Sequence, residues 1–190
     1  MLSDWDHWYP RCEPIGHHLR TAFPNRWVRF HSLPESKRYP EQEAEYAEVL
    51  ARHNAILGEL AERGEPVVLL TTGYSDSPGP RRIYPELESL DPDPSPWRTC
   101  SLHDPNDPSD RPMYWHVFAN YRIWYPGEFD PLVRLVADDV IANVLVVSTN
   151  CRWVLHPYDG GMDVIVESGA ERDSLASHYS GWLSAHPGGL

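Results

Sequence analysis

The clearest grouping of residues that could do chemistry surrounds a short turn near the C-terminus. His156, Asp159 and Asp163 lie close together in the chain, and a histidine with two carboxylates can hold a divalent metal. The Asp159-Gly160 pair is also typical of a tight β-hairpin, where the aspartate side chain hydrogen-bonds to turn amides. We expect this structural role for Asp159, and no metal at the turn.

A second grouping of histidines and acids lies near the N-terminus. Its members are His7, His17 and His18 with Asp4, Asp6 and Glu13. Such a segment can bind a metal weakly, but its spacing fits no defined site with a fixed ligand count. We therefore expect these residues to form ordinary surface.

Sequence motifs for nucleophilic catalysis and phosphate binding are missing. Neither Gly-x-Ser-x-Gly nor Gly-x-x-x-x-Gly-Lys occurs in the chain. The cysteines, Cys12, Cys100 and Cys151, are few, far apart and free of any Cys-x-x-Cys pair, which argues against a disulfide framework and a zinc site. Either Cys100 or Cys151 could meet a histidine in the fold, but an isolated cysteine is usually a small buried hydrophobe. We expect no catalytic residue and no cofactor.

A binding surface is predicted on the open face of the sheet. Arginine, imidazole and aromatic groups on such a face can bind a peptide, a base or an anion. The candidate residues are Arg29, His31, His116, Asn120, Arg122 and Trp124, with His156 and Asp159 added from the turn. The alternative is that the proline-rich segment folds over this face and buries it.

The elements that must position these residues follow from hydrophobic spacing and capping signals. Alternation with a period of two predicts a long strand over 113–125, and i, i+3, i+4 spacing predicts a helix from Pro40 to a stop at Gly64. Asp130-Pro131 predicts a helix start, and Ser168 with Glu171 matches a capping box. Further strands are expected at 26–33, 67–71, 97–102, 144–147 and on both sides of Asp159-Gly160.

The predicted fold class is α+β, with a mixed, mainly antiparallel sheet of about six strands and about three helices packed on one face. We expect one domain over 1–190, with an irregular N-terminal arm over 1–24. Nine of the 19 prolines lie between Gly73 and Pro112, so residues 73–112 are predicted to be a Pro/Asp-rich insertion. Long irregular segments of this kind are often functional.

The charge balance narrows the classes of partner. The net charge is −12 with histidine neutral, which argues against nucleic acid and anionic membrane surfaces, because both need clustered Lys and Arg. It suits a basic protein partner, although solubility alone would also explain it. The acidic N-terminus is unlike a signal peptide, no long apolar run is present, and sparse cysteines fit a reducing compartment. We expect a cytoplasmic protein.

Two segments resemble a family of small uncharacterised bacterial domains. The resemblance rests on Arg29-Phe-His-Ser-Leu33, on 130–163 with its ending His156-Pro-Tyr-Asp-Gly-Gly-Met-Asp163, and on Tyr179-x-x-Trp-Leu183. Members of the family look like the small acidic proteins that accompany bacterial toxin systems as immunity factors. The resemblance implies no catalytic residue.

Two functional hypotheses follow. The first is a non-enzymatic cytosolic binding protein, of the immunity type, that neutralises a basic partner such as a toxin through an acidic helix face. That face consists of Glu41, Glu45, Glu48, Glu59 and Glu62. The second is a small-molecule enzyme with a site between the sheet and the 73–112 segment, where a histidine would serve as general base.

Overall fold

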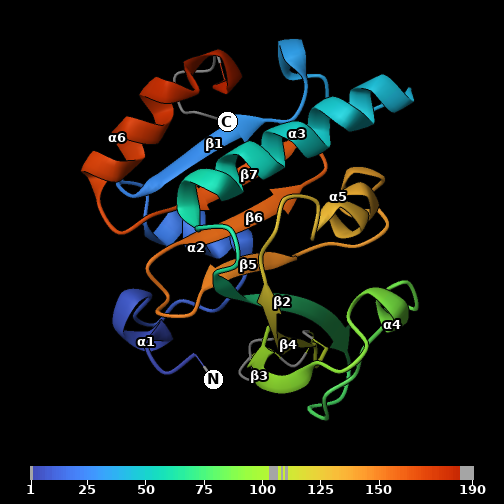
Figure 1. Ribbon diagram of the computed structural model, residues 1–190. Coiled ribbons are helices and arrows are strands. Elements are labelled where there is room, and N and C mark those ends of the chain that lie inside the picture. The colour runs from blue at the N-terminus through green and yellow to red at the C-terminus, as the bar shows by residue number, and fades with distance from the viewer. Residues whose placement is uncertain (1, 103–106, 108, 110, 185–190) are drawn as a thin grey trace.

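The structure is a computed structural model that describes residues 2–102, 107, 109 and 111–184. Its centre is one seven-stranded sheet in the order β1-β7-β6-β5-β2-β4-β3 (Figure 1). The strands are β1 Trp27–His31, β2 Pro66–Ser75, β3 Ser95–Ser101, β4 Tyr114–Ile123, β5 Leu145–Ser148, β6 Val154–Tyr158 and β7 Gly161–Ile165. The predicted α+β class is confirmed.

Every strand pairing in this sheet is antiparallel, so the expected mixed sheet is replaced by a purely antiparallel one. β1 and β2, which flank the first long helix in sequence, are separated by three strands. The central strand β5 is buried at every position, as its apolar sequence predicts. The Asp159-Gly160 hairpin joins β6 to β7.

Three helices cover one face of the sheet, as the hydrophobic spacing predicts. They are α3 Glu43–Leu60, α5 Asp130–Ala137 and α6 Gly169–His178. Their apolar side chains join those of one sheet face in a single core, which includes Phe30, Leu69 and Leu155. Ser168 caps α6 by accepting a hydrogen bond from Glu171 N at 3.2 Å, which is one half of the predicted capping box. The Glu171 side chain accepts from Glu167 N at 3.1 Å, one residue before the position that the box requires. The sequence His186-Pro-Gly-Gly-Leu190 predicts the end of the C-terminal helical segment, and it lies outside the described residues.

The N-terminal arm, predicted to be irregular, forms two short helices, α1 Trp5–Trp8 and α2 Gly16–Ala22. They cover the opposite face of the sheet (Figure 1). There Trp5, Tyr9 and Leu19 are fully buried against a second apolar core. The prediction missed them because helices this short carry no periodic signal, and because prolines at positions 10, 14 and 24 only bound them.

The proline-rich segment packs on the sheet around α4 Leu87–Leu90 and β3. The backbone of Arg81 lies so close to Gly73 of β2 that a Cβ there would be 2.2 Å from the Arg81 carbonyl oxygen. Leu87 and the fully buried Asp91 then lie on the face that carries α3. Most of 103–110, which was predicted to be irregular, lies outside the described residues.

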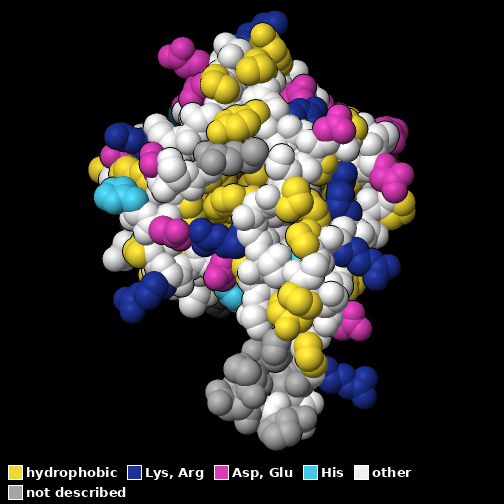
Figure 2. All heavy atoms as spheres, turned by 90° about the horizontal axis from the view of Figure 1, so that it is seen from below, with side chains coloured by type: hydrophobic (Ala, Val, Ile, Leu, Met, Phe, Trp, Pro, Cys, Tyr) yellow, Lys and Arg dark blue, Asp and Glu magenta, His cyan; other side chains and the backbone are white. Residues whose placement is uncertain are grey.

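The edge of the sheet formed by β2, β4 and β3 carries exposed apolar side chains. Tyr74, Tyr121 and Ile123 are each about half exposed. Figure 2, which views the molecule from below, shows hydrophobic side chains at the surface there, among charged ones. No helix of the described chain is long and apolar enough to cross a membrane.

Candidate functional site

The predicted binding face divides between the two sides of the sheet. Along β4, Val117 and Ala119 belong to the core under α1 and α2. Because successive side chains alternate, His116 and Asn120 point to the α3 side.

On β1, Val28 and Phe30 face α3, so Arg29 and His31 point to the α2 side. The prediction that these residues share one face is therefore wrong. Sequence alternation assigns two faces to each strand, but it does not say which face of one strand matches which face of another.

The β4 half of the predicted set has structural partners. His116 is fully buried, with Nε2 2.9 Å from Ser75 Oγ and Nδ1 3.2 Å from Thr99 Oγ1. Asn120 Nδ2 donates to Asp91 Oδ1 at 2.7 Å, and Thr71 Oγ1 donates to the other oxygen of Asp91 at 3.1 Å. The proline-rich segment thus buries Asn120, but on the side of the sheet that carries α3 and not on the open face where the alternative placed the segment.

Arg122, near the end of β4, and Trp124, just after the strand, also have partners within the protein. Arg122 donates from Nη1 to Leu90 O at 2.9 Å and pairs with Glu128. Trp124 is almost fully buried in the core with α3. Trp124 is therefore closed to a ligand, and Arg122 is already bound to neighbouring groups.

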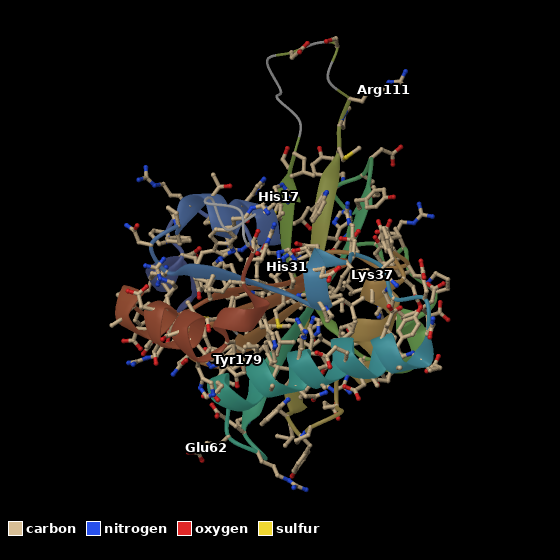
Figure 3. The ribbon with its side chains drawn as sticks, turned by 90° about the horizontal axis from the view of Figure 1, so that it is seen from above. His17, His31, Lys37, Glu62, Arg111 and Tyr179 are labelled. Carbon is tan, nitrogen blue, oxygen red and sulfur yellow. The ribbon has the colours of Figure 1, made fainter. Side chains whose placement is uncertain are left out.

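The other four predicted residues line one pocket on the α2 side, over β1, β7 and β6. The pocket has a volume of about 450 Å³ and is lined by His17, Arg20, Arg29, His31, Ser36, Arg38, His156, Tyr158, Asp159, Gly160 and Asp163. Figure 3 shows His17 of α2 and His31 of β1 near each other, with α3 and Tyr179 across the sheet from them. Arg29, His31, His156 and Asp159, which were proposed from two separate segments, therefore share one site.

Strand register builds the pocket floor from two rows of side chains. In the first row, Asp163 of β7 lies opposite Arg29 of β1 and opposite His156 of β6. In the second row, Gly161 lies between His31 and Tyr158. A Cβ at Gly161 would be 2.1 Å from Phe30 O and 2.9 Å from the Tyr158 hydroxyl, so only glycine fits between them.

Asp163 is the charge centre of the first row. Arg29 donates to both of its carboxylate oxygens at 2.8 and 2.9 Å, and Trp27 Nε1 donates at 2.8 Å. His156 Nδ1 is 3.8 Å away, too far for a hydrogen bond. Burial alone would raise the pKa of Asp163, but His156 and Arg29 together lower it to about 2. Asp163 is therefore ionised at neutral pH.

A second ion pair closes the rim of the pocket at the hairpin turn. Arg38 Nε donates to Asp159 Oδ2 at 2.6 Å, and the Tyr39 hydroxyl donates to the same oxygen at 2.9 Å. Asp159 thus binds side chains outside its own hairpin. Among the described residues, no group of three or more His, Cys, Asp or Glu is arranged to hold a metal ion.

Helix α2 forms the wall of the pocket, and its start is fixed by Asn143. Gly16 N donates to Asn143 Oδ1 at 2.8 Å, and Asn143 Nδ2 donates back to Pro14 O at 3.1 Å. A Cβ on Gly16 would lie 2.2 Å from the ring of His156, so the helix backbone rests on that imidazole. His17 and Arg20, at i and i+3, then share one side of the helix and line the pocket.

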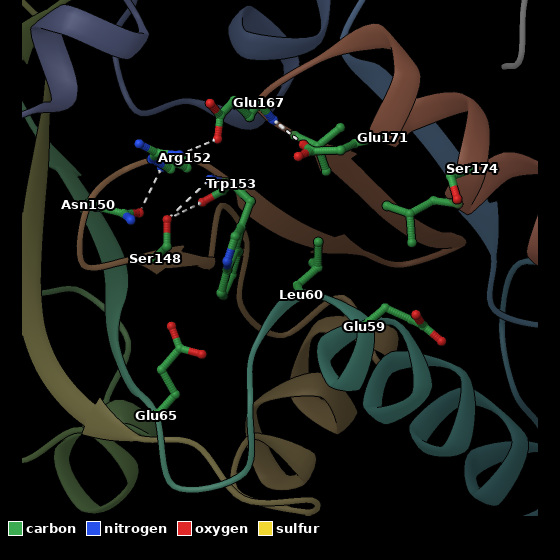
Figure 4. A pocket seen from close by; sticks show the side chains of 12 residues that line it. Glu59, Leu60, Glu65, Ser148, Asn150, Arg152, Trp153, Glu167, Glu171 and Ser174 are labelled. Carbon is green, nitrogen blue, oxygen red and sulfur yellow. Dashed lines mark hydrogen bonds and ion pairs between the residues drawn. The ribbon is translucent and has the colours of Figure 1, made fainter.

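An acidic groove lies on the α3 side of the sheet, where the ends of α3 and α6 meet the β5–β6 turn (Figure 4). It has a volume of about 350 Å³, and its lining contains four carboxylates and one arginine. The charged residues are Glu59, Glu65, Glu167, Glu171 and Arg152, and the apolar ones are Leu60, Trp153, Val166 and Leu175. Sequence reasoning found Glu59 on the acidic helix face and Glu171 in the capping box, but it could not bring α3, α6 and the β5–β6 turn together.

Hydrogen bonds hold several of these carboxylates in place. Glu167 pairs with Arg152 at 2.7 Å, and Glu171 accepts from Glu167 N at 3.1 Å. Glu59 accepts from the Tyr179 hydroxyl at 2.9 Å. Among the described residues that line the groove, Arg152 is the one basic side chain against four glutamates, so the groove keeps an excess of negative charge.

Comparison with known proteins identifies the family and leaves the activity open. Residues 15–187 match the family described as a domain of unknown function, DUF3885. The chain belongs to this family, and the matched range includes the proline-rich segment. No curated protein is detectably similar to the chain. No solved structure is either.

Proposed function

We propose that this member of the DUF3885 family is a non-enzymatic, cytoplasmic binding protein that engages a basic protein partner through the acidic groove, in the manner of an immunity protein. The net charge of −12 supports a basic partner. The three unpaired, buried cysteines are compatible with a reducing compartment.

The observation that carries the proposal is the placement of carboxylates at the negative end of α3. Glu59 lies in the last turn of this helix, Glu62 follows it, and that turn has no basic residue. Carboxylates at a helix C-terminus are unfavourable by a few tenths to about 1 kcal/mol each, because they face the negative end of the helix dipole. A cation in the groove would relieve this cost.

The floor of the groove indicates which cation it suits. Trp153 and Leu60 line the floor, with Trp153 mostly buried. Lysine and arginine lay their aliphatic stems along apolar surface and keep the charged head in a polar environment. A lysine or arginine of the partner would therefore place its stem on Trp153 and its head among the glutamates.

The rest of the predicted acidic face of α3 is largely neutralised. Lys37 pairs with Glu45 at 2.6 Å and Glu41 at 3.3 Å, and Arg52 pairs with Glu48 at 2.7 Å. The negative charge that remains for a partner is therefore concentrated at the C-terminal end of the helix.

The region between the sheet and residues 73–112, where the enzyme hypothesis places its site, also supports the binding proposal. A site between the sheet and 73–112 would use side chains such as His116 and Asn120, and both already bond to neighbouring residues. The described part of the segment packs directly on the strands. This filled face favours binding over catalysis.

The test measures how a lysine- and arginine-rich peptide binds, by fluorescence anisotropy at low and physiological salt. Replacing Glu59→Gln and Glu65→Gln together should weaken binding about tenfold, since each close charge contributes roughly 0.5–1 kcal/mol. The control pair Glu86→Gln and Glu88→Gln removes the same charge from exposed positions around α4 and should leave binding unchanged. Equal losses in both pairs would show that the peptide senses only net charge.

The immunity role has its own test in cells. The protein would be co-expressed with basic, growth-inhibiting proteins encoded beside its gene. Rescue of growth by the wild type and by the α4 control pair, with loss of rescue in the groove pair, is the expected result. Equal rescue by all three proteins would contradict a role for the groove.

A further inference from the structure

We propose that the pocket between α2 and strands β1, β7 and β6 binds a small organic anion, whose phosphate or carboxylate head meets Arg20, Arg29 and the pocket histidines while its apolar body lies in the adjoining hollow. The proposal concerns the opposite side of the sheet from the acidic groove and stands independently of it.

The charge of the pocket is opposite to that of the molecule. Its lining contributes three guanidinium groups and two carboxylates, in addition to three imidazoles, within a chain of net charge −12. A local positive site in an acidic protein is unfavourable for a basic ligand and suits an anion. Low-dielectric walls of the kind formed by α2 and the sheet strengthen this attraction.

Arg20 is the strongest single indication. Arg29 and Arg38 are each paired with an aspartate, but among the described residues Arg20 has no carboxylate partner and no hydrogen bond. Its side chain is partly buried. A guanidinium held at a pocket wall without an internal anion has all five N–H donors available to a ligand.

Arg29 also retains donors after pairing with Asp163. The pair uses Nε and Nη2, so the two hydrogens on Nη1 and one on Nη2 remain. The guanidinium carbon lies 4.4 Å from the centre of the Tyr158 ring, which fixes its position beneath the pocket. An ordered guanidinium loses little freedom when an anion arrives.

Two imidazole nitrogens add to the set. His31 Nε2 and His156 Nδ1 are buried and have no hydrogen-bond partner among the described residues. Burial lowers the pKa of His31, and the nearby Arg29 lowers it further, which is the direction expected for a site without its counter-ion. A bound anion would favour the protonated imidazole, in which both ring nitrogens are hydrogen-bond donors.

The adjoining hollow explains why the ligand has an apolar part. A second cavity of about 290 Å³ shares His17, Arg38, His156, Tyr158 and Asp159 with the pocket. Beyond these its apolar lining consists of Trp115, Val136, Ile141, Ala142 and Pro157, and its polar lining of Tyr39, Asp139 and Asn143. Pockets with a few convergent polar groups and apolar walls are typical of small-molecule sites.

The test is calorimetric titration of the whole protein with phenyl phosphate, inorganic phosphate, benzoate and phenol. Phenyl phosphate or benzoate should bind, inorganic phosphate more weakly, and neutral phenol least. The stronger of the two aromatic anions identifies the head group as phosphate or carboxylate. Equal binding of inorganic and phenyl phosphate would contradict the apolar half of the site, and no binding of any anion below about 10 mM would overturn the proposal.

Arg20→Gln is the diagnostic variant, because this replacement breaks no ion pair among the described residues. It should weaken binding of the preferred anion about tenfold, the effect of losing one charge-assisted hydrogen-bonding group. Arg63→Gln, at an exposed position near the C-terminal end of α3, removes the same charge and should bind as the wild type does. Equal weakening in both variants would show non-specific attraction.

Imidazole NMR provides a second measurement that does not depend on affinity. Saturation with the preferred anion should move the ring resonances of His31 and His156 and leave that of the exposed His7 in place. Unmoved pocket resonances at saturation would place the anion elsewhere and refute the site.

Discussion

At the scale of single residues, burial decides which titratable groups can react. Cys12, Cys100 and Cys151 are 7%, 3% and 0% exposed. Their pKa values are raised to about 11, 12 and 11, chiefly by burial, with a contribution from Glu13 at Cys12 and Cys100 and from Asp4 at Cys151. The thiolate is the reactive form, so these cysteines are suited to packing.

The first prediction is that iodoacetamide leaves all three cysteines of the native protein unlabelled near neutral pH. Mass spectrometry should show no adduct in the time that free cysteine reacts fully, and three adducts after unfolding in urea. Cys100 is the critical residue, because its thiol donates to Glu13 at 2.9 Å. Rapid native labelling of Cys100 would contradict the structure and reopen thiol chemistry.

The second prediction concerns His53, which lies in α3 and is fully enclosed. Burial lowers its pKa from about 6.5 to about 4. The unfolded chain binds the proton more readily than the folded protein does. The contribution of neutral His53 to the free energy of unfolding is therefore fully present above pH 6.5 and is lost as pH falls toward 4. The free energy of unfolding should decrease by up to about 3 kcal/mol across this window.

The His53→Leu variant tests that assignment. Urea unfolding at several pH values should show a shallower dependence than in the wild type, with a remaining slope from His31 and His116, whose pKa values are lowered in the same direction. Asp163 does not interfere, because its pKa is depressed and its contribution is lost only below about pH 4. An unchanged slope would show that His53 is protonated in the folded protein.

At the scale of elements, two glycine-to-alanine replacements should change stability in opposite directions, one through a steric contact and one through helix propensity. Gly16→Ala would push a methyl group into the His156 ring and should destabilise the protein by about 1–3 kcal/mol, the usual cost of overpacking. Gly58 lies inside α3, where a Cβ would sit 3.6 Å from Trp124. Gly58→Ala should stabilise by about 0.5–1 kcal/mol. Thermal unfolding of both variants gives the comparison, and a harmless Gly16→Ala would mean that α2 does not rest on His156.

Elements with strong local patterns were predictable, and their mutual placement was not. Period two along β4, the apolar run of β5 and the Ser168 cap of α6 are properties of neighbouring residues, so they can be read from the sequence. The joining of His31, Asp163 and His156 in one pocket depends on the order β1-β7-β6, which is a matter of long-range pairing. Gly161 carried no signal at all, because its role is to leave space between two strands.

At the scale of the whole molecule, the two faces of the sheet are completed by different parts of the chain. One face receives α3, α5 and α6, and the other receives α1 and α2. The family match begins at residue 15, so α1 lies before the matched range although Trp5 is fully buried. The indole N–H of Trp5 donates to Cys12 O at 2.9 Å. The centre of the Trp5 ring lies 4.6 Å from that of Tyr9 and 5.5 Å from that of Trp97.

The last prediction follows from this arrangement. Trp5→Ala should cost about 3–5 kcal/mol, the usual range for a buried tryptophan, since it opens the core formed by Val68, Leu70 and Val117. The measurement is urea unfolding, with ANS fluorescence to report exposed apolar surface. His7→Ala, at an exposed position of the same helix, is the control and should change stability by less than about 0.5 kcal/mol. If Trp5→Ala were as mild as the control, α1 would not be packed on the sheet, and the α2 side of the molecule would be more open than the structure shows.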